Sequence, residues 1–400
     1  MFHRYATRLF VLAPMAAATT VVHCQSIINN NNNNTDTDSD VDRRTRVMNI
    51  ATKMQRVFVN KLRNLEDNDK EDSQQDFQPH SWLRDNGLHG GGTRFQSSPT
   101  STAFKQATVN VSSVHFHDLV NYPINSATAL SVIVHPKHPL APSLHFHISY
   151  MEPRTGPGYW RMIADLNPAA LEVDRHLLED ARPNSLVLKD SLAKTQHMSS
   201  SLYKDALEFG DKYFYIPSLG RHRGVYHMFI CKLHDDEIKF DDSCHLAEDL
   251  ALRAISTYVD LVQRSLHDFP SESVTIEQKE IQLAYHTLYL YQVLTLDRGT
   301  THGLMAHDQN DVGTMGSLPP AIDRELLAAW MSRTPSPQDE LLQMILDVVP
   351  NDGVIDDHVR KKLAKIVRTH YRTKKEAREM QAELNFEWWK ERTVERLAER

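Results

Sequence analysis

Two pairs of histidines have a spacing that suits metal ligands. His115 and His117, and likewise His145 and His147, lie two residues apart in segments that alternate like strands, so both rings of a pair would point to one face of a sheet. A specific metal site also needs ordered carboxylate or thiolate partners, and nothing in the sequence supplies them. Because accidental pairs are common in a chain with 22 histidines, we predict no metal site.

The cysteines and the short motifs exclude several other chemistries. Cys24, Cys231 and Cys244 form neither an even disulfide set nor a CxxC pair, so they are predicted to be free thiols. The sequence contains no GxxxxGK[ST] phosphate loop, no GxGxxG after a strand, no HExxH and no GxSxG. These absences disfavour kinases, dehydrogenases, zinc proteases and esterases.

Composition describes a globular protein without a nucleic-acid partner. The 400 residues are 40% hydrophobic and 24% charged, which is ordinary for a folded chain. The net charge of -7 gives no global basic field, so we expect no DNA partner. The length fits two or three domains, or one large α+β domain with tails. We predict no transmembrane segment in the mature protein, because no apolar run beyond the N-terminus reaches the roughly 20 residues needed.

The N-terminal 76 residues separate into two predicted parts. Residues 1–34 contain arginines but no acidic residue and end in a tract of six asparagines, which is typical of a targeting segment followed by a spacer. We predict mitochondrial import through a transit peptide, with plastid import and secretion as the alternatives. Residues 35–76 are predicted to be a flexible linker carrying one amphipathic helix, so that the folded core begins near Phe77.

The C-terminal residues 351–400 are predicted to form a charged helical tail. Val359, Leu363, Val367 and Tyr371 have helical spacing, which indicates one apolar stripe on a solvated helix that is broken once. A second interpretation makes the tail a docking arm for a protein partner, anchored by Phe386, Trp388 and Trp389. The sequence leaves both open.

The central segments predict paired strands and the turns between them. The segment 131–152 contains two alternating runs around a proline-rich turn, which is typical of an antiparallel hairpin. An earlier segment places Gly90, Gly91 and Gly92 before another alternating run, and glycines there permit a sharp turn or a close approach to a ligand.

In these segments the chain resembles the oxygen-dependent coproporphyrinogen III oxidases. The glycine-rich start and the hairpin resemble the family's, and three later stretches agree in order: YWRMIADLNP at 159–168, LYKDALEFGDKYFYIPSLGRHRGVYHMF from Leu202, and LTLDRGTTHGL with GSLPP within 294–320. In the last of these the family pattern is a strand that ends in Asp-Arg-Gly-Thr. The resemblance spans about residues 77–349.

The resemblance implies both a fold and a reaction. The fold is α+β, with a large, flat antiparallel sheet flanked by helices on both faces in residues 77–350, here with the C-terminal helical extension; family members usually form homodimers. The reaction converts two propionates of coproporphyrinogen III into vinyl groups in haem biosynthesis. Molecular oxygen is the co-substrate, and no cofactor is required.

The resemblance also assigns roles to six residues. Asp165 matches the carboxylate that contacts the pyrrole nitrogens, and His145 is assigned to the catalytic group with it. The substrate-binding assignments are Ser131, Arg223, Arg161 and His147, of which Arg223 is a natural partner for a propionate. Asp165 has a second interpretation, as a turn cap in front of Asn167. Arg298 is interpreted as structural.

The chain departs from the family pattern at several of these positions. Two and four residues after the hairpin histidine, the family's asparagine and arginine are replaced by His147 and Ser149, which removes one carboxylate clamp. The glycine triplet before the aspartate is replaced by Arg161, Met162 and Ile163, which add bulk where a tetrapyrrole would approach the backbone. Later departures are Val225, Tyr226, His227, Cys231 and Lys232.

These departures leave two hypotheses. In the first, the chain is a divergent oxidase in which Arg161 supplies the cation lost at Ser149. In the second, it is a pseudoenzyme that binds a tetrapyrrole or serves as a structural subunit.

Overall fold

The computed structural model describes residues 38–66, 77–116, 123–167, 184–306 and 309–381. The predicted targeting segment, its asparagine tract and the aromatic anchors near residue 388 lie outside the described residues. None of the described helices is both long enough and apolar enough to cross a membrane.

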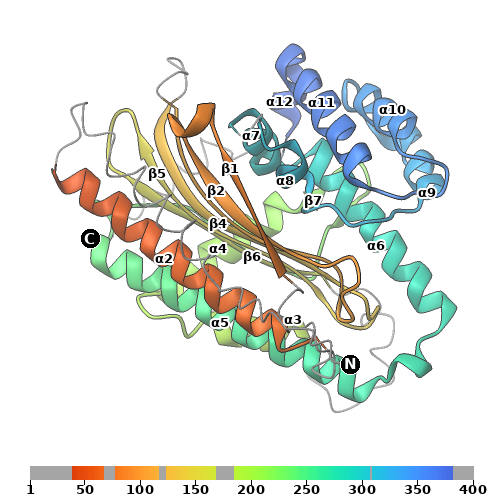
Figure 1. The fold of residues 1–400 in the computed structure, drawn as a ribbon, viewed down its shortest axis with the longest axis horizontal. Coiled ribbons are helices and arrows are strands. Elements are labelled where there is room, and N and C mark those ends of the chain that lie inside the picture. Colours follow the sequence, from red (N-terminus) through yellow and green to blue (C-terminus); the bar gives the residue numbers. More distant parts are fainter. Residues whose placement is uncertain (1–37, 67–76, 117–122, 168–183, 307–308, 382–400) are drawn as a thin grey trace, which may run out of the picture.

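An antiparallel sheet of seven strands runs through the centre of the molecule (Figure 1). Strand order follows the chain, β1-β2-β3-β4-β5-β6-β9. The hairpin predicted at 131–152 is confirmed as β4 and β5, whose register pairs Ser131 with His147. The strands are β1 (Phe77–Leu83), β2 (Gly90–Ser97), β3 (Phe104–His115), β4 (Ile124–Pro136), β5 (Ser143–Pro153), β6 (Tyr159–Asn167) and β9 (Tyr226–His234).

Helices cover both faces of the sheet, as expected for the predicted α+β fold (Figure 1). One face carries α2 (Asp38–Arg63), α3 (Asn184–Leu192) and α5 (Phe240–Asp268), while α4 (Ser200–Tyr213) packs on β9. A short ribbon of β7 (Tyr215–Ile216) and β8 (Arg221–His222) connects α4 to β9. The other face carries α6 (Ile276–Thr295), α7 (Arg298–Ala306), α8 (Asp311–Met315), α9 (Arg324–Ala329), α10 (Gln338–Val348), α11 (Asp357–Thr373) and α12 (Lys375–Met380).

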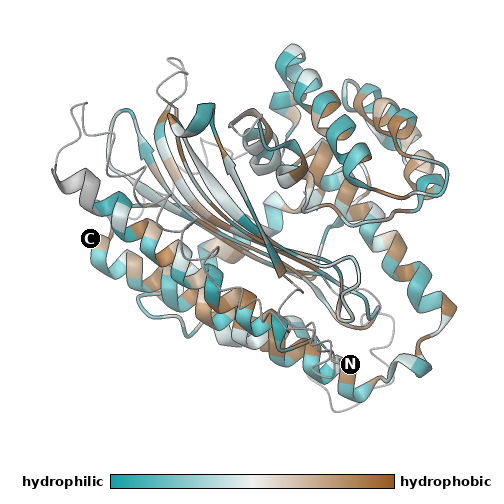
Figure 2. Cartoon of the chain, viewed as in Figure 1, coloured by the Kyte–Doolittle hydropathy of each residue, from teal (hydrophilic) through white to brown (hydrophobic). Residues whose placement is uncertain are grey.

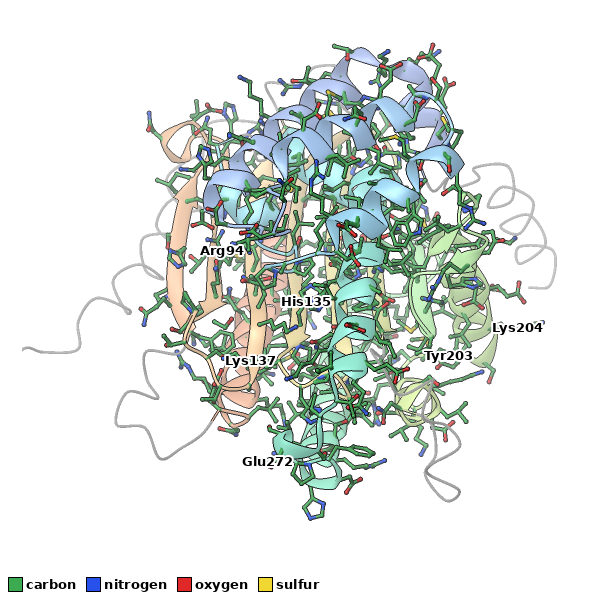
Figure 3. All side chains as sticks on the ribbon, turned by 90° about the vertical axis from the view of Figure 1, so that its right-hand side faces the viewer. Arg94, His135, Lys137, Tyr203, Lys204 and Glu272 are labelled. Atoms are coloured by element: carbon green, nitrogen blue, oxygen red, sulfur yellow. The ribbon has the colours of Figure 1, made fainter. Side chains whose placement is uncertain are left out.

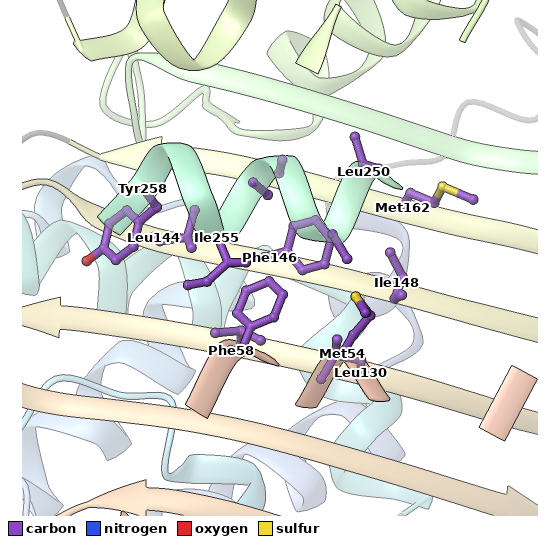
Figure 4. Packing of buried hydrophobic residues seen from close by; sticks show 14 of the residues in the cluster. Met54, Phe58, Leu130, Leu144, Phe146, Ile148, Met162, Leu250, Ile255 and Tyr258 are labelled. Carbon is purple, nitrogen blue, oxygen red and sulfur yellow. The ribbon is translucent and has the colours of Figure 1, made fainter. Parts of the chain in front are cut away.

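The face under α2 and α5 is an apolar core. Every second residue of the strands points into it. Figure 4 shows Met54 and Phe58 of α2 packed beside Leu130, Phe146 and Ile148 of the sheet. The rings of Phe58 and Phe146 stack with centroids 5.3 Å apart. Burying one such aromatic side chain stabilises a fold by about 2–3 kcal/mol.

Helix α2 corrects the boundary that we predicted at Phe77. The helix was expected within a flexible linker over residues 35–76, yet its apolar stripe, including Met54, Phe58 and Leu62, is fully buried in the core. Brown and teal residues alternate along α2 in Figure 2, as an amphipathic helix on a sheet requires. The core therefore includes residues before 77.

The described part of the C-terminal tail also belongs to a core. Val359, Leu363, Val367 and Tyr371 of α11 are buried in a second apolar cluster with α6 and α10, and the helix ends before Lys374, where the chain breaks into α12. The stripe that we read from the sequence is thus the packed face. The basic side of the helix stays toward solvent.

One local expectation was wrong. The segment that ends in Asp-Arg-Gly-Thr was expected to be a strand, but Leu294 lies in the last turn of helix α6. A capping box of Thr275 and Gln278 starts this helix, and the run from Tyr285 to Thr295 is buried on all sides between the sheet and the outer helices. A helix that is buried on all sides lacks the polar, solvent-facing stripe that would separate it from a buried strand.

Candidate active site

The sheet face under α6 is polar, and most of the predicted site residues lie on it. The register pairs His145 with Asp165 and Asp165 with His227 across three adjacent strands. Directly paired residues share a face of a sheet. Ser131 and His147, paired between β4 and β5, belong to the same face by their parity. The sheet therefore brings five sequence-predicted residues together: Ser131, His145, His147, Arg161 and Asp165.

Asp165 and Arg223 form an ion pair at the centre of this face. Both side chains are fully buried, and Arg223 Nη2 donates to Asp165 Oδ2. Asp165 lies within strand β6 and not at a turn, as the second interpretation of this residue would require. Arg223, in the turn before β9, also reaches His145 Nδ1 at 3.1 Å. The catalytic pair assigned from the resemblance is thus linked through the arginine.

Aromatic rings and a helix amide hold Arg223 in place. Its guanidinium lies 4.4 Å from the ring centroid of Phe214 and 4.8 Å from that of Tyr289, a favourable arrangement for a planar cation. Nη1 donates to Oε1 of Gln292 on α6 at 2.6 Å. The arginine is therefore held by Phe214, by helix α6 and by strand β6, where its ion-pair partner is Asp165.

This pairing keeps Asp165 charged inside the protein. Burial acts to raise the pKa of the carboxyl, but the opposing field of Arg223, with His145 and His227, holds the pKa below its usual range. The same partnership raises the pKa of Arg223 above its already high value, against the effect of burial. Asp165 is thus an ionised carboxylate. It can accept hydrogen bonds, but its low pKa makes it a weak proton acceptor.

One oxygen of this carboxylate has no donor among the described residues. Asp165 Oδ2 accepts from Arg223 and from Asn167 Nδ2 at 3.0 Å, whereas Oδ1 is buried without a hydrogen-bond partner, as is Asn167 Oδ1. Both oxygens lie against Gly224: a β-carbon there would come within 3.0 Å of Asp165 Oδ1 and 2.4 Å of Asn167 Oδ1. Two buried acceptors without donors are unusual in a folded protein, and they suit an N–H ligand.

His147 and Ser149, which stand where the family pattern has asparagine and arginine, lie next to each other on the same face of β5. His147 Nε2 bonds Ser149 Oγ at 3.0 Å, and burial, with His145 and Arg161 nearby, lowers the pKa of His147 to about 3. Its ring is therefore neutral at physiological pH. His147 can donate or accept a hydrogen bond there, but it does not replace the positive charge that the family pattern places at Ser149.

Arg161 faces Ser149 directly across the strands. The register pairs Ser149 of β5 with Arg161 of β6. The positive charge that the family pattern has at Ser149 is therefore present in this chain at the paired position on the next strand. The Arg161 guanidinium lies 5.3 Å from the Phe229 ring centroid, and its Nε is buried without a partner among the described residues. Of the other two replaced glycines, Met162 points into the apolar core (Figure 4), and only Ile163 adds bulk on the polar face.

Helix α6 supplies site residues that the sequence reasoning missed. Tyr285, Tyr289 and Gln292 follow one another at spacings of four and three, hence on one helix face, and that face meets Arg223. His286 is fully buried with both ring nitrogens unpartnered among the described residues. Its ring lies 5.2 Å from that of His135, which Figure 3 labels beside α6. The polar and aromatic spacing within an apolar helix was the available signal.

Of the two histidine pairs, His145 and His147 belong to no group of three convergent metal ligands among the described residues. They are engaged with Arg223 and Ser149 respectively, and His117 of the other pair lies outside the described residues. The described residues form one group of three convergent metal ligands, and it lies away from this face, at His197, Asp242 and His245. Cys231 is buried in the site wall, where burial raises its pKa to about 11, so the thiol is protonated and is not a nucleophile.

Comparison with known proteins agrees with this arrangement. A family model described as coproporphyrinogen III oxidase matches residues 46–349. The chain belongs to the coproporphyrinogen III oxidase family. The match begins inside α2, consistent with the packing of that helix in the core. It ends before α11, so the last described helices extend beyond the part that the family model covers.

The relatives are moderately similar and are matched over most of their length. The oxygen-dependent coproporphyrinogen-III oxidase of Prochlorococcus marinus subsp. pastoris is 27% identical over 317 residues, which cover 72% of this chain and 85% of the relative. The enzyme of the same name from Rickettsia bellii is 31% identical over 252 residues, or 60% of this chain and 83% of the relative. The resemblance seen in the sequence is thereby confirmed.

Proposed function

We propose that this protein is an oxygen-dependent coproporphyrinogen III oxidase of haem biosynthesis. The observation that carries the proposal is the buried Asp165 carboxylate, with Oδ2 held by Arg223 and Oδ1 left without a donor. The names of the relatives support it, and the comparisons favour it over the second hypothesis, a degenerate binding or structural subunit.

The carboxylate suits the first step of the reaction. Pyrrole N–H groups of the substrate are donors, and Asp165 Oδ1 is an acceptor whose charge is maintained by Arg223. A bond from N–H to carboxylate increases electron density on the ring, which aids removal of hydrogen from the propionate carbon next to it. Each propionate then loses carbon dioxide and one hydrogen, with two electrons passing to oxygen, and a vinyl group remains.

Cations on the polar face suit the propionates. Arg161 Nε is buried without a hydrogen-bond partner among the described residues, so we propose Arg161 as a clamp for one propionate, with His147 near it and Ser131 paired to His147 on the next strand. Arg223 remains a predicted substrate contact, although its visible role is to hold Asp165. A charge-assisted hydrogen bond of this kind contributes about 1.5–3 kcal/mol.

The remaining features of the proposal follow the resemblance and the sequence. We propose that oxygen is the only co-substrate, that no metal or organic cofactor takes part, and that the protein forms homodimers. We also propose mitochondrial import, supported by the basic, acid-free composition of residues 1–34.

The decisive experiment compares two buried, ion-paired aspartates. Asp165→Asn preserves shape and removes the charge; Asp235→Asn does the same on the other face of the sheet, where Asp235 bonds Tyr150 and Arg43. Each purified variant is incubated aerobically with coproporphyrinogen III, and porphyrin products are separated after oxidation. We expect Asp165→Asn to lose at least a hundredfold in kcat and the folded fraction of Asp235→Asn to retain it. Equal activity of the two variants would refute the catalytic assignment, and an inactive wild-type chain would favour the degenerate subunit.

A further inference from the structure

Three potential metal ligands converge on the surface of α5, on the side of the sheet opposite Asp165. Asp242 and His245 lie three residues apart near the start of α5, so they share one face of the helix. His197, from the segment that joins α3 to α4, lies against them. Each of the three residues offers one ligand atom, and these three atoms lie within 4.8 Å of one another.

The backbone of the joining segment directs His197 toward this group. The amide of Gln196 donates to Asp249 Oδ2 of α5 at 2.8 Å, and Ser199 caps α4 just beyond. Between them His197 has φ +60°, a left-handed conformation that costs about 1 kcal/mol for a residue with a β-carbon. The segment is therefore tied to α5 on one side and to α4 on the other, and the imidazole is held between these attachments.

The charges around Asp242 set it apart from its acidic neighbours on α5. Asp241 pairs with Arg46, Glu248 with Lys53, and Asp249 with Arg253. Within the described ranges, the ion-pair partner of Asp242 is His197 alone, whose Nδ1 lies 3.8 Å from Asp242 Oδ1. The His197 and His245 rings are stacked with centroids 6.0 Å apart. A carboxylate beside two imidazoles, with no Lys or Arg of the described chain paired to it, has the composition of a zinc ligand set.

We propose that His197, Asp242 and His245 form a site for a divalent transition metal, with zinc as the expected occupant. Two imidazoles and one carboxylate favour zinc over calcium or magnesium, which prefer oxygen ligands. Ligands of a tetrahedral zinc ion lie about 3.3 Å apart at bond lengths near 2.1 Å, so the three atoms need to move inward by about 1 Å. His197 and Asp242 are 36% and 38% exposed, which leaves the fourth position to water.

The bound ion would fasten the segment between α3 and α4 onto α5. This segment holds the start of α4, whose far end carries Tyr213 in contact with Asp297 near the polar face. The site itself lies on α5, across the sheet from Asp165. We therefore expect the metal to stabilise the fold and to leave the proposed oxidase chemistry unchanged.

Metal content of the full chain tests the proposal. Protein treated with EDTA is dialysed against zinc chloride, and then against metal-free buffer, before elemental analysis; a parallel sample receives cobalt chloride. We expect one tightly held zinc per chain, a rise in Tm of about 5 °C, and the visible absorption of tetrahedral cobalt. Metal content and Tm do not depend on oxidase activity, so a failure here is distinct from a failure of the proposed function.

Matched variants locate the site. His197→Asn keeps a residue that tolerates the left-handed conformation and removes the imidazole, and Asp242→Asn and His245→Ala remove the other ligands. Each should lose the stoichiometric zinc and the cobalt absorption while keeping a native circular dichroism spectrum. His267→Ala, at an exposed His-Asp pair at the other end of α5, should keep both signals. A wild-type chain without retained zinc, or any ligand variant with full zinc content, would overturn the proposal.

Discussion

The two faces of the central sheet are built from the same alternating strands and have opposite chemistry. Under α2 and α5 the strands present apolar side chains such as Phe146 and Trp160, whereas under α6 they present Asp165, His145 and Arg161. Packing on the first face is dominated by apolar contacts, and a buried polar atom without a partner, such as Asp235 Oδ1, is an exception there. The second face contains several, including Asp165 Oδ1 and both nitrogens of His286. One face stabilises the fold, whereas the buried polar groups without partners on the other face lower its stability.

The largest effect is expected from breaking the central ion pair of the polar face. Arg223→Met leaves Asp165 buried without its cation, which costs about 3–5 kcal/mol in the free energy of unfolding and raises the pKa of Asp165, so that activity is lost as well. Urea titration and product assay measure the two effects. Asp165→Asn combined with Arg223→Met should recover most of the stability and none of the activity. If the double variant is as unstable as the single one, Arg223 acts through its contacts with Phe214 and Tyr289 instead.

On the apolar face an effect of similar size on stability should leave activity intact. Phe58→Ala removes a fully buried ring stacked on Phe146 and is expected to cost about 3–5 kcal/mol. Urea denaturation gives the loss, and kcat/KM is measured on the folded fraction below the new transition. A change in kcat/KM of more than about twofold would show that the two faces are coupled through the sheet.

A smaller effect is expected from the displaced cation. Arg161→Gly should lower kcat/KM by about 10- to 150-fold, equivalent to one charge-assisted bond of 1.5–3 kcal/mol, mainly through KM. Because Ser149 lies opposite Arg161, adding Ser149→Arg to Arg161→Gly returns a cation to the paired position and should restore most of the loss.

The single Ser149→Arg variant is the control for this exchange. It places two guanidinium groups opposite each other at a buried position, so the protein should be destabilised without a gain in kcat/KM. If the double variant is no more active than Arg161→Gly alone, the two positions do not serve the same propionate.

Local strand signals were sufficient for part of the sheet, and the resemblance implied the rest. Alternation around the proline-rich turn gave β4 and β5, and the ordered motifs gave the family and the α+β fold. The same motifs placed Asp165, His145 and Arg223 in one site without showing that they bond to one another. That Arg223 is bound by Asp165 depends on the meeting of β6 with the turn before β9, 58 residues later in the chain, and no local pattern contains this information.

The errors have separate causes. The strand expected to end in Asp-Arg-Gly-Thr was taken from the family pattern, whereas the chain forms helix α6 up to Thr295, and Tyr289 and Gln292 were missed with it. The amphipathic helix within residues 35–76 was predicted, but it was assigned to a linker because polar segments flank it, whereas its apolar stripe packs in the core. The metal-ligand group at His197 joins a loop to a helix 45 residues away, and its left-handed backbone has no sequence signal in a histidine.

The smallest of the expected effects concerns the pH response of the polar face. His135 is fully buried beside His286 and Tyr289, and burial lowers its pKa to about 3. In the unfolded chain a histidine takes up a proton near pH 6.5, so between pH 6.5 and 3 the unfolded state binds more protons and stability falls as the pH falls. Above pH 6.5 His135 adds no pH dependence. His135→Gln, which retains a hydrogen-bonding side chain, should therefore lose about 2 kcal/mol less than the wild type between pH 7 and pH 5, as measured by urea titration at each pH. Equal losses in the two proteins would mean that the His135 ring is protonated in the folded state, and the polar face would then be more open to water than its burial indicates.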